Sequence, residues 1–131
     1  MGTEIYKIGS DDLTNRPYLR HVAGRGKPVI FSSGMATLEE IEEAIGAMHD
    51  AGNRQLVLLQ CVSNYPVTDL AVVNLRTIPA FAARFPVLVG FSDHTTALAA
   101  AVAAVAPGAA VVERPFALGT RPPVPDASFS A

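Results

Sequence analysis

KPVIFSSGMATLEEIEEAI, residues 27–45, is the stretch that decides the fold class. Its first part, 29–33, is a short apolar run typical of a strand buried on both faces. A capping box, Thr37-Leu-Glu-Glu40, then predicts a helix start. The helix has one apolar side and is expected to end at Gly52. The residues of that side are Leu38, Ile41, Ala44, Ile45 and Met48.

The same strand-then-helix unit recurs in both directions along the chain. Pro79 falls inside the third helical pattern and predicts a late helix start or a kink there. Strands that alternate with helices at this spacing indicate a parallel sheet with right-handed crossovers. The expected strands are 5–10, 29–33, 55–61, 87–91 and 110–113, the other helices are about 13–23, 73–85 and 97–105, and the tail 119–131 is expected to be a loop.

Composition and charge exclude several functional classes. The 131 residues have room for one domain. A net charge of −2 and a pI near 5.8 leave no basic stripe, so no nucleic-acid partner is expected. Half of the residues are hydrophobic and the mean hydropathy is +0.30, which suits buried parallel strands. Cys61 is the only cysteine, so no internal disulfide can form and a cytoplasmic location is the expectation.

The chain shows no sign of a membrane or export segment. Residues 1–12 lack the basic start and apolar core of a signal peptide. The most apolar stretch, 97–112, is mostly alanine and is interrupted by Pro107-Gly108, whereas a span needs about 20 strongly apolar residues. We therefore expect a protein without a membrane partner.

Every expected strand finishes in polar or reactive residues. Carboxyl ends of parallel strands carry the functional site in α/β proteins. Five such ends in a row favour a shared anion site, although a serine can also simply start a loop or cap a helix. The groups are Lys7 with Ser10, then Ser32-Ser33, Ser63 with Tyr65, Ser92-Asp93-His94, and Glu113-Arg114.

Five segments of the chain carry a resemblance to a known family. They are YKIGSDDLTN (6–15), KPVIFSSGMATLEEIEEAI (27–45), LLQCVSNYP (58–66), VNLRTIP (73–79) and VGFSDHT (89–95). In order and spacing they resemble the N-acetylneuraminate (sialic acid) synthases and their legionaminate and pseudaminate relatives. The resemblance covers nearly the whole chain. It implies a partial (β/α)8 TIM barrel, in which 1–131 form the C-terminal part with strands 4–8, without the first three βα units or the antifreeze-like domain.

The resemblance also implies an activity. The family are transferases that condense phosphoenolpyruvate with an open-chain N-acetylated hexosamine, giving a sialic acid-type sugar and phosphate. Residues of the family's phosphoenolpyruvate site correspond here to Lys7, Ser10, Ser32, Ser63 and Ser92. Asp12 and Tyr65 fall where the family contacts the sugar. A homodimer or a complementing N-terminal fragment is a possible partner.

A divalent metal, Mn²⁺ or Mg²⁺, is the cofactor that the resemblance implies. His94 corresponds to one family ligand, and Asp126 to a site aspartate near the metal. The family's last strand reads EKHFTL, and its histidine is the second ligand. Here that position is Pro115, which has no lone pair to offer, so metal affinity should be weakened. Lys7, His94 and Asp126 are the expected catalytic residues.

Several alternatives stay open at this point. Asp12 could instead be the N-cap of the first helix, Lys7 could face solvent, and Tyr65 could simply pack. The chain could be a non-catalytic remnant or one part of a split enzyme. A self-contained doubly wound binding domain is weaker, because GRGKP (24–28) lacks the spacing of a phosphate-binding loop. His21 and His49 lie outside the motifs and are expected to face solvent.

Overall fold

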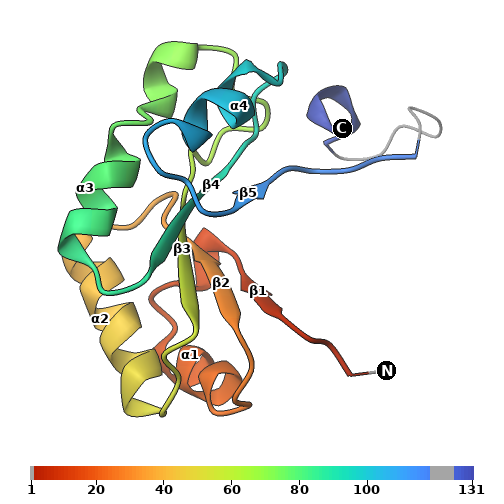
Figure 1. Ribbon diagram of the computed structural model, residues 1–131. Helices are drawn as coiled ribbons and strands as arrows, with labels where there is room; N and C mark the ends of the chain where they lie inside the picture. Colours follow the sequence, from red (N-terminus) through yellow and green to blue (C-terminus); the bar gives the residue numbers. More distant parts are fainter. Residues whose placement is uncertain (1, 119–125) are drawn as a thin grey trace.

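The computed structural model describes residues 2–118 and 126–131, which form an open half-barrel (Figure 1). Its sheet has five parallel strands in the order β1-β2-β3-β4-β5, so neighbours in space are neighbours in sequence. This order confirms the partial barrel and excludes the doubly wound alternative, whose strand order reverses at a switch point. The strands are β1 Tyr6–Ile8, β2 Val29–Ser32, β3 Leu56–Gln60, β4 Leu88–Ser92 and β5 Val112–Glu113.

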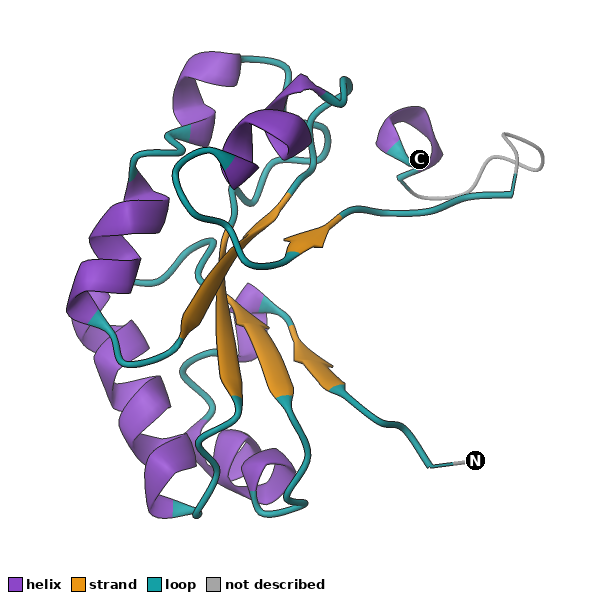
Figure 2. Ribbon diagram, in the orientation of Figure 1, coloured by secondary structure: helices purple, strands orange, loops and turns teal. Residues whose placement is uncertain are grey.

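The helices cover the convex side of the sheet, and the concave side is left open (Figure 2). No helix among residues 2–118 and 126–131 has the length and apolarity needed to cross a bilayer. The α-helices are α1 Arg16–Ala23, α2 Leu38–Asp50, α3 Thr77–Arg84 and α4 Ala99–Val105, and short 3-10 turns are η1 Ser10–Asp12, η2 Leu70–Val73 and η3 Ala127–Phe129.

The helix starts follow local capping chemistry. The capping box of α2 is present: the Glu40 amide donates to the Thr37 hydroxyl at 3.2 Å, and the Thr37 amide donates to the Glu40 carboxylate at 2.8 Å. The first helix begins later than expected, because Asn15 is its N-cap and Pro17 lies in its first turn. The late start expected from Pro79 is confirmed, since α3 begins at Thr77.

Alternation along the strands separates two faces of the sheet. The helix-facing side of the central strands is buried and forms the core with the apolar sides of the helices. Its strand residues are Ile8, Val29, Phe31, Leu56, Leu58, Val89 and Phe91. On the inner side Ile5 and Leu88 are 51% and 60% exposed. The concave face therefore exposes apolar side chains near the amino ends of β1 and β4.

Two histidines outside the motifs behave differently. His21 is exposed, as expected. The expectation for His49 is wrong: it is half-buried on α2, and its Nε2 has no hydrogen-bond partner among the described residues. Burial and the nearby Arg54 lower the pKa of His49, because both disfavour the charged imidazole.

Candidate functional site

A cavity of about 530 Å³ lies at the carboxyl ends of the strands. It collects residues from every strand end, as parallel architecture requires. All but one of the expected site residues line it. The lining residues are Lys7, Gly9, Ser10, Asp11, Ser32, Met35, Cys61, Ser63, Tyr65, Ser92, His94, Glu113, Arg114, Pro115 and Asp126.

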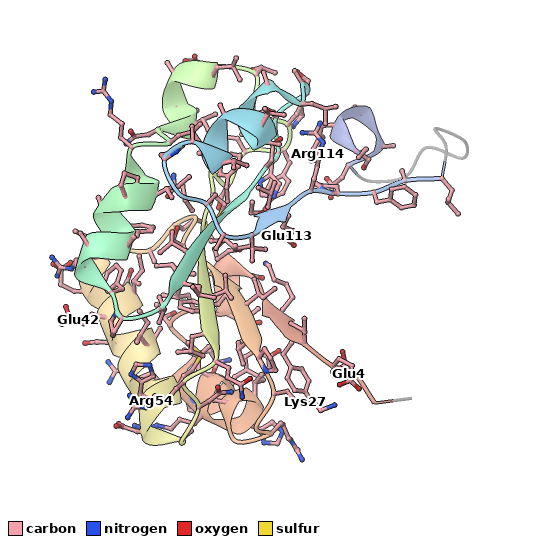
Figure 3. All side chains as sticks on the ribbon, viewed as in Figure 1. Glu4, Lys27, Glu42, Arg54, Glu113 and Arg114 are labelled. Atoms are coloured by element: carbon pink, nitrogen blue, oxygen red, sulfur yellow. The ribbon has the colours of Figure 1, made fainter. Side chains whose placement is uncertain are left out.

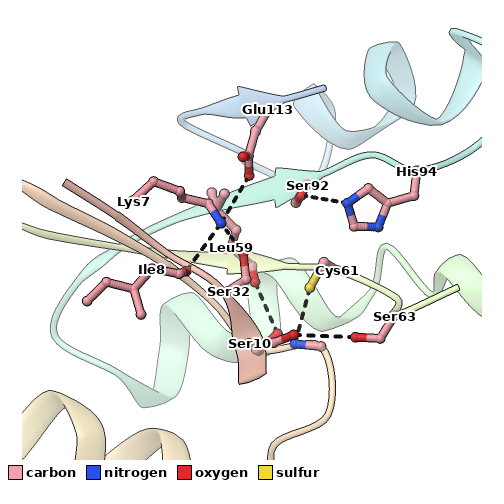
Figure 4. Close-up of polar contacts among 12 residues, drawn as sticks. Lys7, Ile8, Ser10, Ser32, Leu59, Cys61, Ser63, Ser92, His94 and Glu113 are labelled. Atoms are coloured by element: carbon pink, nitrogen blue, oxygen red, sulfur yellow. Dashed lines mark hydrogen bonds and ion pairs between the residues drawn. The ribbon is translucent and has the colours of Figure 1, made fainter. Parts of the chain in front are cut away.

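Lys7 on β1 is one of the two cations that line this cavity, with Arg114, and its ammonium faces Ser32 and Glu113 (Figure 4). Its Nζ donates to the Ser32 hydroxyl at 3.0 Å and to the Ile8 carbonyl at 3.2 Å. It also lies 3.5 Å from Oε2 of Glu113, which comes from the last strand. The two ends of the sheet thus face each other across the concave side. Lys7 is about a third exposed, but it points into the site rather than to bulk solvent.

A second cluster of small polar groups sits beside Lys7. The hydroxyls of Ser10 and Ser63 are 3.4 Å apart, and the Gly34 amide donates to the Cys61 sulfur at 3.1 Å. A Cβ at Gly34 would lie 2.3 Å from the Ser63 hydroxyl and 2.9 Å from both the Ser10 hydroxyl and the Cys61 sulfur. Only glycine allows the backbone to approach these atoms so closely. Burial raises the pKa of Cys61, so its thiol is neutral at ordinary pH.

His94 follows β4 and is held with a defined tautomer. Its Nδ1 lies 3.0 Å from the Val62 carbonyl, which can only accept, so Nδ1 carries the proton. The lone pair is then on Nε2, where the Ser92 hydroxyl lies 3.3 Å away. A hydrogen bond of this kind to the far nitrogen is the usual way to orient a metal-binding imidazole.

Two aromatic rings lie close to His94. The Tyr65 ring centroid lies 4.3 Å from that of His94, and Phe129 lies 6.2 Å from both. Tyr65 lines the cavity while 58% exposed, so simple core packing does not describe it. Burial of its hydroxyl end raises the pKa of Tyr65. Asp126, the first residue described after the gap, lines the same cavity.

Asp12 is the one expected site residue outside the cavity lining. Its carboxylate accepts from the Asn15 side chain at 3.4 Å, while the neighbouring Asp11 lines the cavity. The alternative reading of Asp12 as N-cap of the first helix is wrong, because Asn15 has that position. The 3-10 turn at 10–12 rotates successive side chains in a way that strand alternation does not anticipate.

Cys61 and Asp11 are cavity residues that the sequence analysis did not propose, and Glu113 was named there only as a polar strand end, without a role in the site. For two of them a signal was present. Glu113 ends the fifth strand in the same way as Ser92 ends the fourth, and the two residues pair in register. Cys61 follows β3 directly, on the same face as Leu59.

Of the residues expected to bind a metal, His94 is the one whose ring is oriented by hydrogen bonds. The His94 Nε2 is correctly presented, but no group of three or more His, Cys, Asp or Glu side chains that could hold a metal occurs within 2–118 and 126–131. Pro115 lines the cavity where the second imidazole would be expected. The described residues therefore do not form a complete metal centre.

Comparison with known proteins agrees with this geometry. An uncharacterized protein, MJ1065, of Methanocaldococcus jannaschii is 44% identical over 131 residues, and the N,N'-diacetyllegionaminic acid synthase of Campylobacter jejuni is 40% identical over 128 residues. These matches cover 100% and 96% of the chain but 39% and 38% of the relatives.

A solved structure gives the same result. The N-acetylneuraminic acid (sialic acid) synthetase of Leptospira borgpetersenii serovar Hardjo-bovis, solved in complex with citrate, superposes with a TM-score of 0.93 at 33% identity. The match covers 99% of this chain and 45% of that protein, so the chain spans about two-fifths of the length of these relatives. Residues 1–131 match the family described as NeuB. The chain belongs to the NeuB family.

Proposed function

We propose that this chain forms the phosphoenolpyruvate-binding part of a nonulosonic acid synthase. The reaction condenses phosphoenolpyruvate with an open-chain N-acetylated hexosamine, similar to N-acetylmannosamine, and releases phosphate. A new C–C bond joins the methylene carbon of phosphoenolpyruvate to the sugar aldehyde carbon, water supplies the oxygen at C2, and the phosphate leaves. Relatives named as legionaminic and sialic acid synthases support this reaction class.

The observation that carries the proposal is the convergence of one ammonium and four hydroxyls in a single cavity. Such a set suits a phosphate and a carboxylate, because it offers several hydrogen-bond donors and one positive charge. The donors come from different strand ends, so the fold and not one loop positions them. They are Lys7, Ser10, Ser32, Ser63 and Ser92.

Glu113 sets a condition on anion binding, because its carboxylate is already near Lys7. Both side chains are more than a third exposed, so their ion pair is worth only about 0–1 kcal/mol. Hydrogen bonds to a charged ligand contribute about 1.5–3 kcal/mol each. A phosphate that gains two or more of them can therefore displace Glu113 from Lys7.

The sugar would approach from the side of Tyr65 and Asp126. Both residues line the cavity with His94, whose ring lies against that of Tyr65, and Asp11 lines it from the 3-10 turn after β1. Hydroxyl and carboxylate groups at a cavity rim suit the hydroxyls and amide of an amino sugar. We propose that His94 is the residue that would hold Mn²⁺ or Mg²⁺, and that it would do so weakly because Pro115 offers no second imidazole.

A non-catalytic phosphate-binding remnant is the second candidate function. It is favoured by Pro115 at the cavity wall and by the incomplete ligand set around His94. In this case the anion site would persist without the condensation reaction. In a split enzyme, this chain alone would bind the anion, and the condensation reaction would require a separate N-terminal fragment.

A titration of phosphoenolpyruvate and of inorganic phosphate into the labelled chain, followed by NMR, tests the anion site. Lys7→Met should weaken binding at least tenfold. Lys27→Met is the matched control, because Lys27 pairs with Glu4 at the other end of the sheet, far from Glu113 (Figure 3). Equal binding by wild type and Lys7→Met would contradict the proposal.

Activity is tested separately by phosphate release from phosphoenolpyruvate, Mn²⁺ and N-acetylmannosamine. The assay compares this chain with a version extended upstream by the family's earlier βα units. Release only by the extended version supports the synthase. Binding without release by either version supports the remnant.

A further inference from the structure

The loop between β4 and α4 contains a buried charge that the anion site does not use. Asp93 is 0% exposed and lies between Ser92 and His94. A carboxylate with no exposure is costly unless it is paired and hydrogen-bonded. Its Oδ1 accepts from the Thr95 amide at 2.9 Å, and its Oδ2 forms an ion pair with the Arg114 guanidinium.

Arg114 reaches this loop from the end of β5. Its side chain is only 11% exposed, and its fork makes three separate contacts with the loop. Nη1 donates to the Asp93 carboxylate and also to the Ala97 carbonyl, which is 3.3 Å away. Nη2 donates to the Thr95 carbonyl at 2.9 Å. The planar, multiple-donor geometry of arginine suits such a clamp, and lysine cannot reproduce all of it.

His94 is the residue enclosed by these contacts. The clamp fixes the chain on both sides of it, at Asp93 and at Thr95. The His94 carbonyl is further fixed by the Val67 amide at 2.8 Å. With its backbone held, the ring can keep Nδ1 on the Val62 carbonyl and Nε2 toward the cavity.

Arg114 could instead be read as a second anion ligand, since it lines the cavity. Its terminal nitrogens already contact one carboxylate and two carbonyls of the protein. Releasing them would leave the fully buried Asp93 without its counter-charge, which is a large penalty. The contacts favour a structural use of the guanidinium over ligand binding.

We propose that Arg114, acting through Asp93, is a positioning residue that fixes the tautomer and direction of the His94 imidazole. This deepens the proposed function and rests on it for the role of His94 in the site. The clamp itself rests only on contacts within the chain.

NMR of the chain carrying ¹⁵N-labelled histidine, recorded at a pH of about 8, tests the proposal. The His94→Ala spectrum identifies the His94 signals. In the wild type the two ring nitrogens should differ widely in shift, with Nδ1 protonated. In Arg114→Met the two shifts should converge, because the ring exchanges between tautomers once the clamp is lost. Arg114→Lys should restore the difference in part.

Arg84→Met is the matched control, because it breaks an exposed ion pair of 3.2 Å with Glu42 on the outer helices. It should leave the His94 signals unchanged. If Arg114→Met does not fold, Asp93→Asn provides the test. It keeps a carbonyl oxygen that can accept from the Thr95 amide, and it removes the charge that pairs with Arg114. Wild-type His94 signals in whichever of these two variants is folded would overturn the proposal. No ligand is present, so this result is independent of whether phosphoenolpyruvate binds.

Discussion

Replacing Gly34 with alanine would test the anion site at its tightest point. The new Cβ would lie 2.3 Å from the Ser63 hydroxyl and 2.9 Å from the Ser10 hydroxyl, closer than real contacts allow. Both serine side chains can rotate away, so the fold can accommodate the new Cβ. The rotation moves their hydroxyls out of the positions that would bind an anion. We therefore expect binding to suffer more than stability.

The two effects can be estimated separately. Overpacking of this kind costs about 1–3 kcal/mol of unfolding free energy, and the lower end applies where serine side chains can move. Loss of one hydroxyl donor to a charged ligand costs about 1.5–3 kcal/mol, which is about a 10- to 150-fold weaker phosphate affinity. Loss of both donors would exceed this range.

Calorimetric titration with phosphate and phosphoenolpyruvate, combined with thermal unfolding, would measure both quantities. Gly46→Ala is the control: it lies within α2, and a Cβ there meets nothing within 4 Å. It should bind like the wild type and be more stable by about 0.8–1 kcal/mol, the helix-propensity difference. A folded Gly34→Ala variant with unchanged phosphate affinity would refute the assignment of these hydroxyls to the anion.

Three further predictions follow from the site and the open sheet. In Mn²⁺ titrations His94→Ala should abolish binding and Pro115→His should strengthen it, through the change in ligand count; equal affinity in all three proteins would place any metal elsewhere. The isolated chain should release no phosphate from substrates and should bind hydrophobic dyes, and Leu88→Thr on the inner face should lower dye binding more than Leu98→Thr at the start of α4, both being about 60% exposed. Cys61 should be alkylated more slowly in the folded than in the unfolded chain at a pH of about 8, because its raised pKa keeps it protonated. The contribution of the protonated Cys61 thiol to the free energy of unfolding is complete below its ordinary pKa of 9.0 and is lost as the pH rises through the higher pKa of the folded state. An unfolding free energy that does not fall over this pH range would contradict the raised pKa of Cys61.

Much of the architecture could be predicted from local sequence. The capping box at Thr37, the strand periodicity and the strand-end polarity are all short-range signals, and the structure confirms the elements that they predict. The cavity location follows from them, because parallel strands end at one edge. Even the choice between Ser32 and Ser33 follows from alternation: Ser32 lines the cavity, and the Ser33 hydroxyl donates to the Leu59 carbonyl at 3.1 Å.

The remaining features depend on contacts between distant parts of the chain. Nothing near Glu113 in sequence indicates that it faces Lys7, because that contact requires the curvature of the whole sheet. Likewise the partner of the buried Asp93, Arg114, comes directly after the next strand. Asp11, and not Asp12, lines the cavity because a 3-10 turn follows β1, which the apolar pattern does not specify.

The contact between Lys7 and Glu113 joins the first strand to the last, and this gives the cavity a thermodynamic property. The β1 and β5 sides of the cavity come together only when the entire sheet has formed. A ligand that contacts both sides therefore binds the native state and not partly folded chains. By mass action, such a ligand at 100 times its Kd would raise the unfolding free energy by about 2.7 kcal/mol. Contacts between chain ends also form late, since they close the longest loop. An anion bound across the cavity would thus stabilise the folded half-barrel, and a shift in melting temperature would report its binding without any turnover.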